Sequence, residues 1–164
     1  RGIPTHSTLI TLEEEGSPVV GVIHLPALGE TYWAAHGSGA YCNGQSIHVS
    51  TRHSLAQVMG SGIGFTKDGT DTKGAALLRL MSDWDYTYGF MDAYTYGCIA
   101  SGKIDACVNL LDKAWDCAAA ACIITEAGGR YSDIYGESTI HNGTFVITNG
   151  LVHNQILSYF SNQR

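Results

Sequence analysis

The chain has 164 residues, 45% of them hydrophobic, which is enough to bury a core and fits one domain, or one domain and part of another. Its formal net charge of −6 at pH 7, without a basic run, argues against nucleic acid or an anionic membrane as the main partner. No apolar run approaches the about 20 residues that cross a bilayer.

The first fifty residues have the pattern of an antiparallel meander. Four β-rich runs are predicted as strands: 7–13, 18–25, 29–35 and 39–42. A polar segment at 14–17 separates the first two runs, as in a hairpin, and Asn43-Gly44 favours a tight type I′ turn after the fourth.

Beyond residue 55, helices and strands alternate. A helical pattern places Leu77, Leu78 and Met81 on one face, and three more helices are predicted at 92–101, 115–127 and 151–162. Strands are predicted at 85–89, 105–110, 129–133 and 144–148. We therefore expect two domains: the remainder of an antiparallel α+β domain at 1–55, and an α/β domain at 56–164.

Cysteines and tyrosines are predicted to pack in the core. No Cys-x-x-Cys pair occurs and the histidines show no zinc-ligand spacing, so the five cysteines are expected to be reduced in a cytoplasmic protein: Cys42, Cys98, Cys107, Cys117 and Cys122. Four tyrosines are expected to form an aromatic packing cluster: Tyr86, Tyr88, Tyr94 and Tyr96.

The most informative segment is 114–129, where a Trp-Asp pair precedes four small residues, an apolar run and Glu-Ala-Gly-Gly. Trp115 and the small residues would let a helix lie close to a sheet, and Gly128-Gly129 would end that helix in a left-handed cap. Asp116 then lies at the helix N-terminus, where amide donors hold a carboxylate and also suit a phosphate oxygen. On position alone, an N-cap role for Asp116 is the simpler interpretation.

This whole pattern resembles the C-terminal signature of the inositol-monophosphatase superfamily. The similarity covers nearly all of the chain, through matching segments at 2–4, 18–23, 25–26, 37–40, 43–44 and 100–106. It implies a layered αβαβα sugar-phosphatase-like fold, of class α+β or α/β, and a magnesium-dependent phosphomonoesterase. In that family the Asp of Trp-Asp is a metal ligand, so the resemblance assigns Mg²⁺ binding and a catalytic role to Asp116.

Within the superfamily, residues 2–4 and 92–94 look most like the histidinol-phosphatase branch. The resemblance implies that Asp92 contacts the alcohol part of the substrate and pairs with an ammonium group such as that of histidinol, although an N-cap explains Asp92 equally well. Met91 replaces a glycine common in that branch and is expected to narrow or repack the substrate pocket. Asn109 stands where relatives carry a substrate-binding Glu or Asp, and its amide keeps the hydrogen-bonding capacity without the charge.

Other metal ligands of this family come from an upstream Glu and from an Asp-Pro-Ile-Asp-Gly-Thr motif that precedes the position of residues 2–4. Residues 67–70 contain Asp-Gly-Thr but lack the preceding residues, so they are not predicted to bind metal. A single carboxylate cannot organise a hydrolytic magnesium site. We therefore expect this chain to be the C-terminal portion of a longer polypeptide and to be inactive alone.

The resemblance implies hydrolysis of L-histidinol phosphate to histidinol and phosphate, in histidine biosynthesis, by an enzyme that is a homodimer when complete. Its partner would be a small phosphorylated metabolite, with neither nucleic acid nor a membrane involved. Inositol-1-monophosphatase shares every motif and is the alternative activity. A catalytically incomplete fragment or a non-enzymatic ligand-binding module is the alternative of another class.

Overall fold

A computed structural model describes residues 2–65, 72–89 and 92–161, with the side chain of Asp92 excepted. Its N-terminal sheet pairs five strands antiparallel in sequence order: β1 (Thr8–Glu14), β2 (Ser17–Leu25), β3 (Glu30–Ala35), β4 (Ala40–Cys42) and β5 (Gln45–Ile47). Asn43 and Gly44 have φ values of 48° and 80°, the positive values that a type I′ turn requires. The predicted meander is confirmed.

The second sheet has the order β7-β6-β8-β10-β9. Its strands are β6 (Met59–Ile63), β7 (Tyr86–Tyr88), β8 (Ala106–Asn109), β9 (Arg130–Ser132) and β10 (Phe145–Thr148). Strand β6 runs parallel to β7 and β8, whereas β10 runs antiparallel to β8 and β9. The strands predicted in this half of the chain are all present.

The described helices are α1 (Thr72–Ser82), α2 (Asp92–Ala100), α3 (Ala114–Glu126) and α4 (His153–Leu157), with a 3₁₀ turn, η1 (Leu55–Gln57). Helix α4 is shorter than predicted. The predicted apolar face of α1 is wrong at Leu78, which is exposed, whereas Leu77 and Leu80 are fully buried. Each residue turns the helix by about 100°, so Leu78 points away from the side that Leu77 and Leu80 share.

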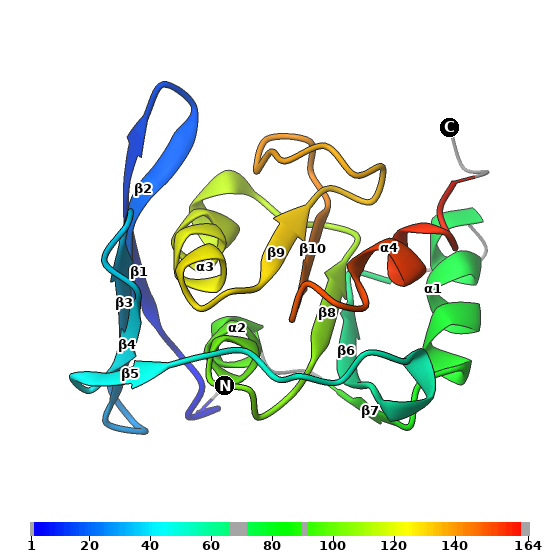
Figure 1. Cartoon of the computed structure of the whole chain (residues 1–164), viewed down its shortest axis with the longest axis horizontal. Helices are drawn as coiled ribbons and strands as arrows, with labels where there is room; N and C mark the ends of the chain where they lie inside the picture. Colours follow the sequence, from blue (N-terminus) through cyan, green and yellow to red (C-terminus); the bar gives the residue numbers. More distant parts are fainter. Residues whose placement is uncertain (1, 66–71, 90–91, 162–164) are drawn as a thin grey trace.

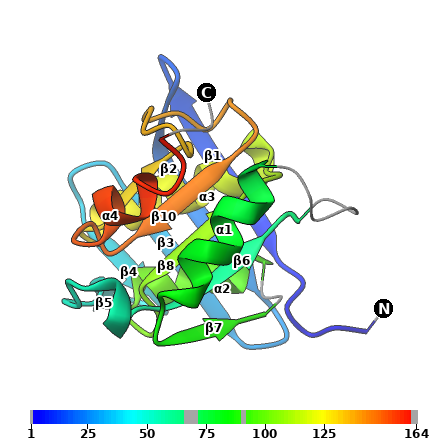
Figure 2. The same ribbon diagram turned by 90° about the vertical axis from the view of Figure 1, so that its right-hand side faces the viewer.

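The elements form alternating layers (Figure 1). The β1–β5 sheet lies at one side, α2 and α3 follow, then the second sheet, and α1 and α4 cover the far face. One apolar core fills the space between the two sheets around α2 and α3, and a smaller one lies between the second sheet and α1 and α4. Figure 2, seen from the α1 side, shows α1 crossing in front of the second sheet. These layers agree with the predicted layered fold.

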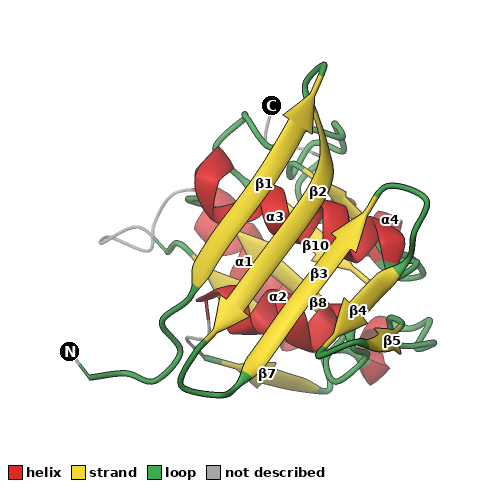
Figure 3. Cartoon of the chain, turned by 90° about the vertical axis from the view of Figure 1, so that its left-hand side faces the viewer, coloured by secondary structure: helices red, strands yellow, loops and turns green. Residues whose placement is uncertain are grey.

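The outer face of the β1–β5 sheet carries no helix from the described part of the chain (Figure 3). Ile10 and Leu12 of β1 and Trp33 of β3 are exposed. Trp33 stacks on Tyr41 of β4, with ring centroids 4.5 Å apart. No helix among the described residues is both long enough and apolar enough to span a membrane.

Helix α3 packs close to the first sheet because small residues face it. A Cβ atom at Gly21 of β2 would lie only 2.4 Å from the carbonyl oxygen of Ala119. The predicted contribution of Trp115 is wrong, since its side chain is 75% exposed at the start of the helix. The close approach therefore depends on Gly21 and on the alanines of α3.

We expect Gly21→Ala to lower the free energy of unfolding by about 2 kcal/mol, because the added methyl group meets main-chain atoms that cannot rotate away. Urea unfolding followed by circular dichroism measures this loss. Gly89→Ala is the matched control, since no atom of the described residues lies within 4 Å of a Cβ atom there, and its effect should stay within about 0.5 kcal/mol. Equal stability of the two variants would contradict the close contact.

The end of α3 is fixed by the Glu-Ala-Gly-Gly sequence. Gly128 has a φ of 87°, and the Gly128 and Gly129 amides donate to the carbonyl oxygens of Thr125 and Ile124, which is the paired pattern of a Schellman motif. The Glu126 carboxylate accepts hydrogen bonds from the amides of Gly37 (2.9 Å) and Gly39 (2.8 Å). The predicted left-handed cap is confirmed, and Glu126 also ties the helix to the β3–β4 turn.

The cysteines are free, as predicted, and four of them are buried while Cys42 is half-buried. The tyrosines do not form one cluster. Tyr86 and Tyr88 are exposed and contact each other edge to face, whereas Tyr96 is buried against Phe145 with ring centroids 5.7 Å apart. The alternation along β7 leaves both of its tyrosines on the surface.

Candidate active site

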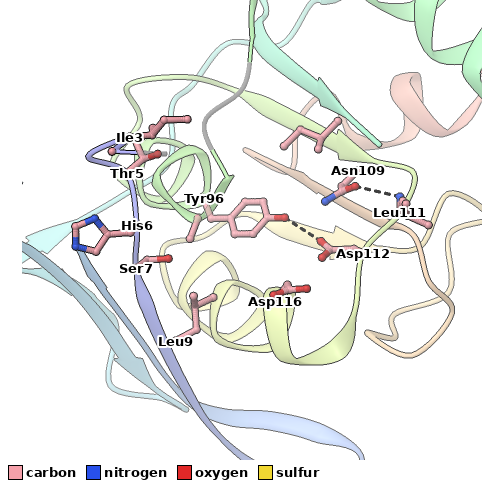
Figure 4. Close-up of a pocket in the computed structure, with 13 residues that line it drawn as sticks. Ile3, Thr5, His6, Ser7, Leu9, Tyr96, Asn109, Leu111, Asp112 and Asp116 are labelled. Atoms are coloured by element: carbon pink, nitrogen blue, oxygen red, sulfur yellow. Dashed lines mark hydrogen bonds between the residues drawn. The ribbon is translucent and has the colours of Figure 1, made fainter. Parts of the chain in front are cut away.

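A cleft of about 710 Å³ opens between the N-terminal segment, α2 and the loop before α3. It is lined by residues from several elements: Gly2, Ile3, Thr5, His6, Ser7, Leu9, Ile63, Ala93, Tyr96, Asn109, Leu111, Asp112 and Asp116. Figure 4 shows Tyr96, Asp112 and Asp116 together on one side, opposite Thr5, His6 and Ser7. Among the described lining residues two are Asp and none is Lys or Arg.

Asp116 lies in the first turn of α3 with an exposed side chain. The N-cap residue is Lys113, which makes no side-chain cap, so the interpretation of Asp116 as an N-cap is wrong. Its own amide donates to the carbonyl oxygen of Lys113 at 2.9 Å and is used within the helix. The carboxylate is therefore held at the helix start without being consumed as a cap, and it faces the cleft.

Asn109 ends β8 and is 7% exposed. Its Oδ1 atom accepts a hydrogen bond from the Leu111 amide at 3.0 Å, which fixes the turn that leads toward α3. Gly64, with a φ of 82°, allows this turn to approach, because a Cβ atom there would lie 2.6 Å from the Leu111 nitrogen. The structure thus brings two of the predicted site residues, Asn109 and Asp116, to one cleft.

Sequence reasoning missed two residues of this cleft, Asp112 and Tyr96. The Tyr96 hydroxyl donates to Oδ2 of Asp112 at 2.8 Å, and the Lys113 amide donates to Oδ1 at 2.9 Å. Burial, with a smaller contribution from the negative charge of Asp116, raises the pKa of Asp112 despite these hydrogen bonds. Its position four residues before Asp116 was the available signal. The sequence carried no such signal for Tyr96, because a buried aromatic residue on a helix usually packs in the core.

The remaining predicted site residues lie at the limit of the described chain. Helix α2 begins at Asp92, and the next residue, Ala93, lines the cleft. The side chain of Asp92 and the whole of Met91 lie outside the described residues, as do residues 67–70. The roles expected for Asp92 and Met91 stay predictions.

The cleft offers part of a site for a hard divalent cation. Carboxylate oxygens are the ligands that Mg²⁺ prefers, and Asp116 presents an exposed carboxylate with Asp112 on the preceding turn of chain. Within residues 2–65, 72–89 and 92–161, no three His, Cys, Asp or Glu side chains are grouped to hold a metal. Asp116 fits a magnesium ligand, but a full ligand set needs oxygen atoms beyond those described.

Solved structures share this fold. The extragenic suppressor protein suhB from Bartonella henselae superposes with a TM-score of 0.90 and 27% identity, over 99% of this chain and 64% of that one. The sequence model of the inositol monophosphatase family matches residues 1–164. The chain belongs to the inositol monophosphatase family.

Several curated relatives are named as phosphatases. A histidinol-phosphatase from Streptomyces coelicolor is 36% identical over 174 residues, which cover 100% of this chain and 65% of that protein. A fructose-1,6-bisphosphatase/inositol-1-monophosphatase from Thermotoga maritima is 32% identical over 162 residues, covering 95% of this chain and 60% of the relative. The chain thus spans less than two thirds of the length of these relatives.

Proposed function

We propose that this chain forms the substrate-facing part of a magnesium-dependent phosphatase for a small phosphate monoester, with L-histidinol phosphate as its substrate. The observation that carries the proposal is the exposed Asp116 carboxylate at the start of α3, in a cleft of about 710 Å³ that Asn109 also lines. The described lining, with two carboxylates and neither Lys nor Arg, repels a phosphate dianion unless a cation intervenes. Names of relatives support the same reaction class.

In this proposal Asp116 holds the cation, and the remaining ligands are oxygen atoms beyond the described residues. Bound Mg²⁺ would neutralise the phosphate and activate the water that attacks it. Asn109 and Asp92 would contact the alcohol part of the substrate, and Met91 would narrow or repack the pocket. Because the described residues supply an incomplete ligand set, we propose that the 164-residue chain alone is inactive. The resemblance to the family is the basis for proposing that the complete gene product acts as a homodimer.

Inositol 1-phosphate is the second candidate substrate, favoured by the name of the Thermotoga maritima relative. The two substrates differ in charge, since histidinol carries an ammonium group and inositol does not. Asn109 has no charge with which to attract an ammonium group, whereas Asp112 of the same cleft does. We therefore place histidinol phosphate, with a role in histidine biosynthesis, before inositol 1-phosphate.

For the complete gene product, we expect kcat/KM for histidinol phosphate to exceed that for inositol 1-phosphate by about 100-fold or more, because pocket contacts set this ratio. Phosphate release measured with each substrate gives the ratio. Chelation with EDTA should abolish both activities and added Mg²⁺ should restore them. Activity that survives chelation, or a ratio reversed in favour of inositol 1-phosphate, would contradict the metal or the substrate, respectively.

A protein that releases phosphate from neither substrate under any metal condition would instead be the non-catalytic alternative, a ligand-binding module that keeps the fold. Calorimetric titration with histidinol phosphate and inositol 1-phosphate distinguishes a binding module from a wrongly assigned cleft. A binding module binds at least one of the two phosphate esters without turnover, whereas a wrongly assigned cleft binds neither ester.

A further inference from the structure

Asp112 is a buried carboxylate at the wall of the cleft. It is 4% exposed, yet it belongs to the residues that line the cleft. Its carboxylate accepts hydrogen bonds from the Tyr96 hydroxyl and the Lys113 amide, and the Asn109 side chain also hydrogen-bonds to it. These neutral donors fix the orientation of the carboxylate but do not balance its charge.

The positive charge that a buried carboxylate needs is not supplied by the described chain. The ion pairs among residues 2–65, 72–89 and 92–161 involve other acids, namely Glu13, Glu30, Asp105 and Glu126. The basic residue that lines the cleft within the described set is His6, which Figure 4 places on the opposite wall. An unbalanced buried charge is costly, and a bound cation would relieve that cost.

Asp112 and Asp116 differ in how exposed their carboxylates are to the cleft. Asp116 is exposed on the first turn of α3, as suits a ligand of a hydrated metal ion. Asp112 is held rigidly between Tyr96 of α2 and the start of α3, and burial raises the pKa of its carboxyl. A rigid, poorly hydrated carboxylate favours an organic cation that donates a directed hydrogen bond.

We infer that Asp112, positioned by Tyr96, is a specificity-determining residue that recognises a protonated amine on the alcohol part of the substrate. This inference rests on the proposed function and narrows its substrate class to amino-alcohol phosphates. The phosphate would lie toward Asp116 and the amine toward Asp112. The cleft would then bind the two oppositely charged groups of the substrate at two separate places. Tyr96 acts through Asp112 as a positioning residue.

The test compares, in the complete gene product, the KM for a substrate that carries an amine with the KM for one that does not. Asp112→Asn keeps a side chain of the same shape that can still accept from the Lys113 amide and donate to the Tyr96 oxygen, while the charge is removed. We expect KM for histidinol phosphate to rise by about 10- to 100-fold, the worth of one charge-assisted hydrogen bond, with kcat and the KM for inositol 1-phosphate within about twofold. Tyr96→Phe should change the same KM in the same direction by less.

Another Asp–Tyr pair serves as the matched control. Asp83 accepts a hydrogen bond from the Tyr159 hydroxyl away from the cleft, so Asp83→Asn removes a carboxylate charge beside a tyrosine without touching the lining. It should leave both KM values unchanged. Parallel rises of both KM values in Asp112→Asn, or no change in either, would overturn the inference and leave the phosphatase proposal standing.

A binding measurement keeps the inference testable without turnover. Histidinol and myo-inositol, without phosphate, are titrated into the complete gene product and into Asp112→Asn by calorimetry. Histidinol should bind the parent protein more tightly than inositol does, and this preference should fall by about tenfold or more in the variant, where Asp92 is unchanged. Retention of the full preference in a folded Asp112→Asn protein would refute amine recognition by Asp112, whereas a parent protein that shows the preference but releases no phosphate would count against the proposed function alone.

Discussion

Asp116→Asn in the complete gene product should lower kcat for histidinol phosphate by at least about 10²-fold, the scale of losing one electrostatic contact to a reacting group. The amide that replaces the carboxylate keeps its size but is a poorer ligand for Mg²⁺. The side chain is exposed and makes no N-cap, so the free energy of unfolding should change by less than about 0.5 kcal/mol. Stopped or steady-state phosphate release measures kcat, and urea unfolding measures stability.

Asp85→Asn is the control, because Asp85 is also an exposed acid but does not line the cleft. It should retain the parent kcat. Calorimetric titration with Mg²⁺ or Mn²⁺ adds a readout that does not depend on turnover, and Asp116→Asn should bind the metal at least about tenfold more weakly. Near-normal kcat together with unchanged metal affinity would refute the assignment of Asp116.

Acid should destabilise the protein through His153. This side chain is fully buried, and burial together with the charge of Arg130 lowers its pKa to about 4 from 6.5. The Ser132 hydroxyl donates to the Asp133 carbonyl and so accepts from Nε2 of His153 (2.9 Å), which leaves Nδ1 to accept from Thr148 (3.0 Å). The folded state therefore holds a neutral imidazole protonated on Nε2.

Since the folded pKa is lower than the unfolded one, the unfolded chain takes up the proton first as pH falls. The stabilising contribution is complete above pH 6.5 and is lost between pH 6.5 and about 4, by about 3 kcal/mol in total. Urea unfolding at a series of pH values measures the slope. His153→Gln should flatten the slope, and His24→Gln, an exposed site, should keep it. An identical slope in His153→Gln would contradict this origin.

Much of the architecture was predictable because local patterns and tertiary packing agree. The hairpin before Ser17, the turn at Asn43-Gly44 and the glycine cap of α3 each have one dominant local cause, and each is present. The side-chain environments were less predictable. Leu78 and Trp115 are apolar residues at positions where the helix faces solvent, and sequence periodicity did not separate them from their buried neighbours.

The candidate site was predictable only where a motif marked it. The Trp-Asp sequence indicated Asp116, and resemblance indicated Asn109, which lines the same cleft. The pairing of Tyr96 with Asp112 joins a helix to a loop 16 residues away, and no local rule predicts which of the chain's acids such a tyrosine will meet. Contacts of this kind arise from how helices cross, which depends on the whole core.

Helix α3 has consequences for where function can be altered. Its first turn carries Asp116. About 15 Å farther along the axis, its last residue, Glu126, accepts hydrogen bonds from the amides of Gly37 and Gly39. A continuous helix resists compression, so these hydrogen bonds anchor the whole helix, including the first turn that carries Asp116. Loss of these hydrogen bonds, far from the cleft, would let the helix shift along its axis and displace Asp116.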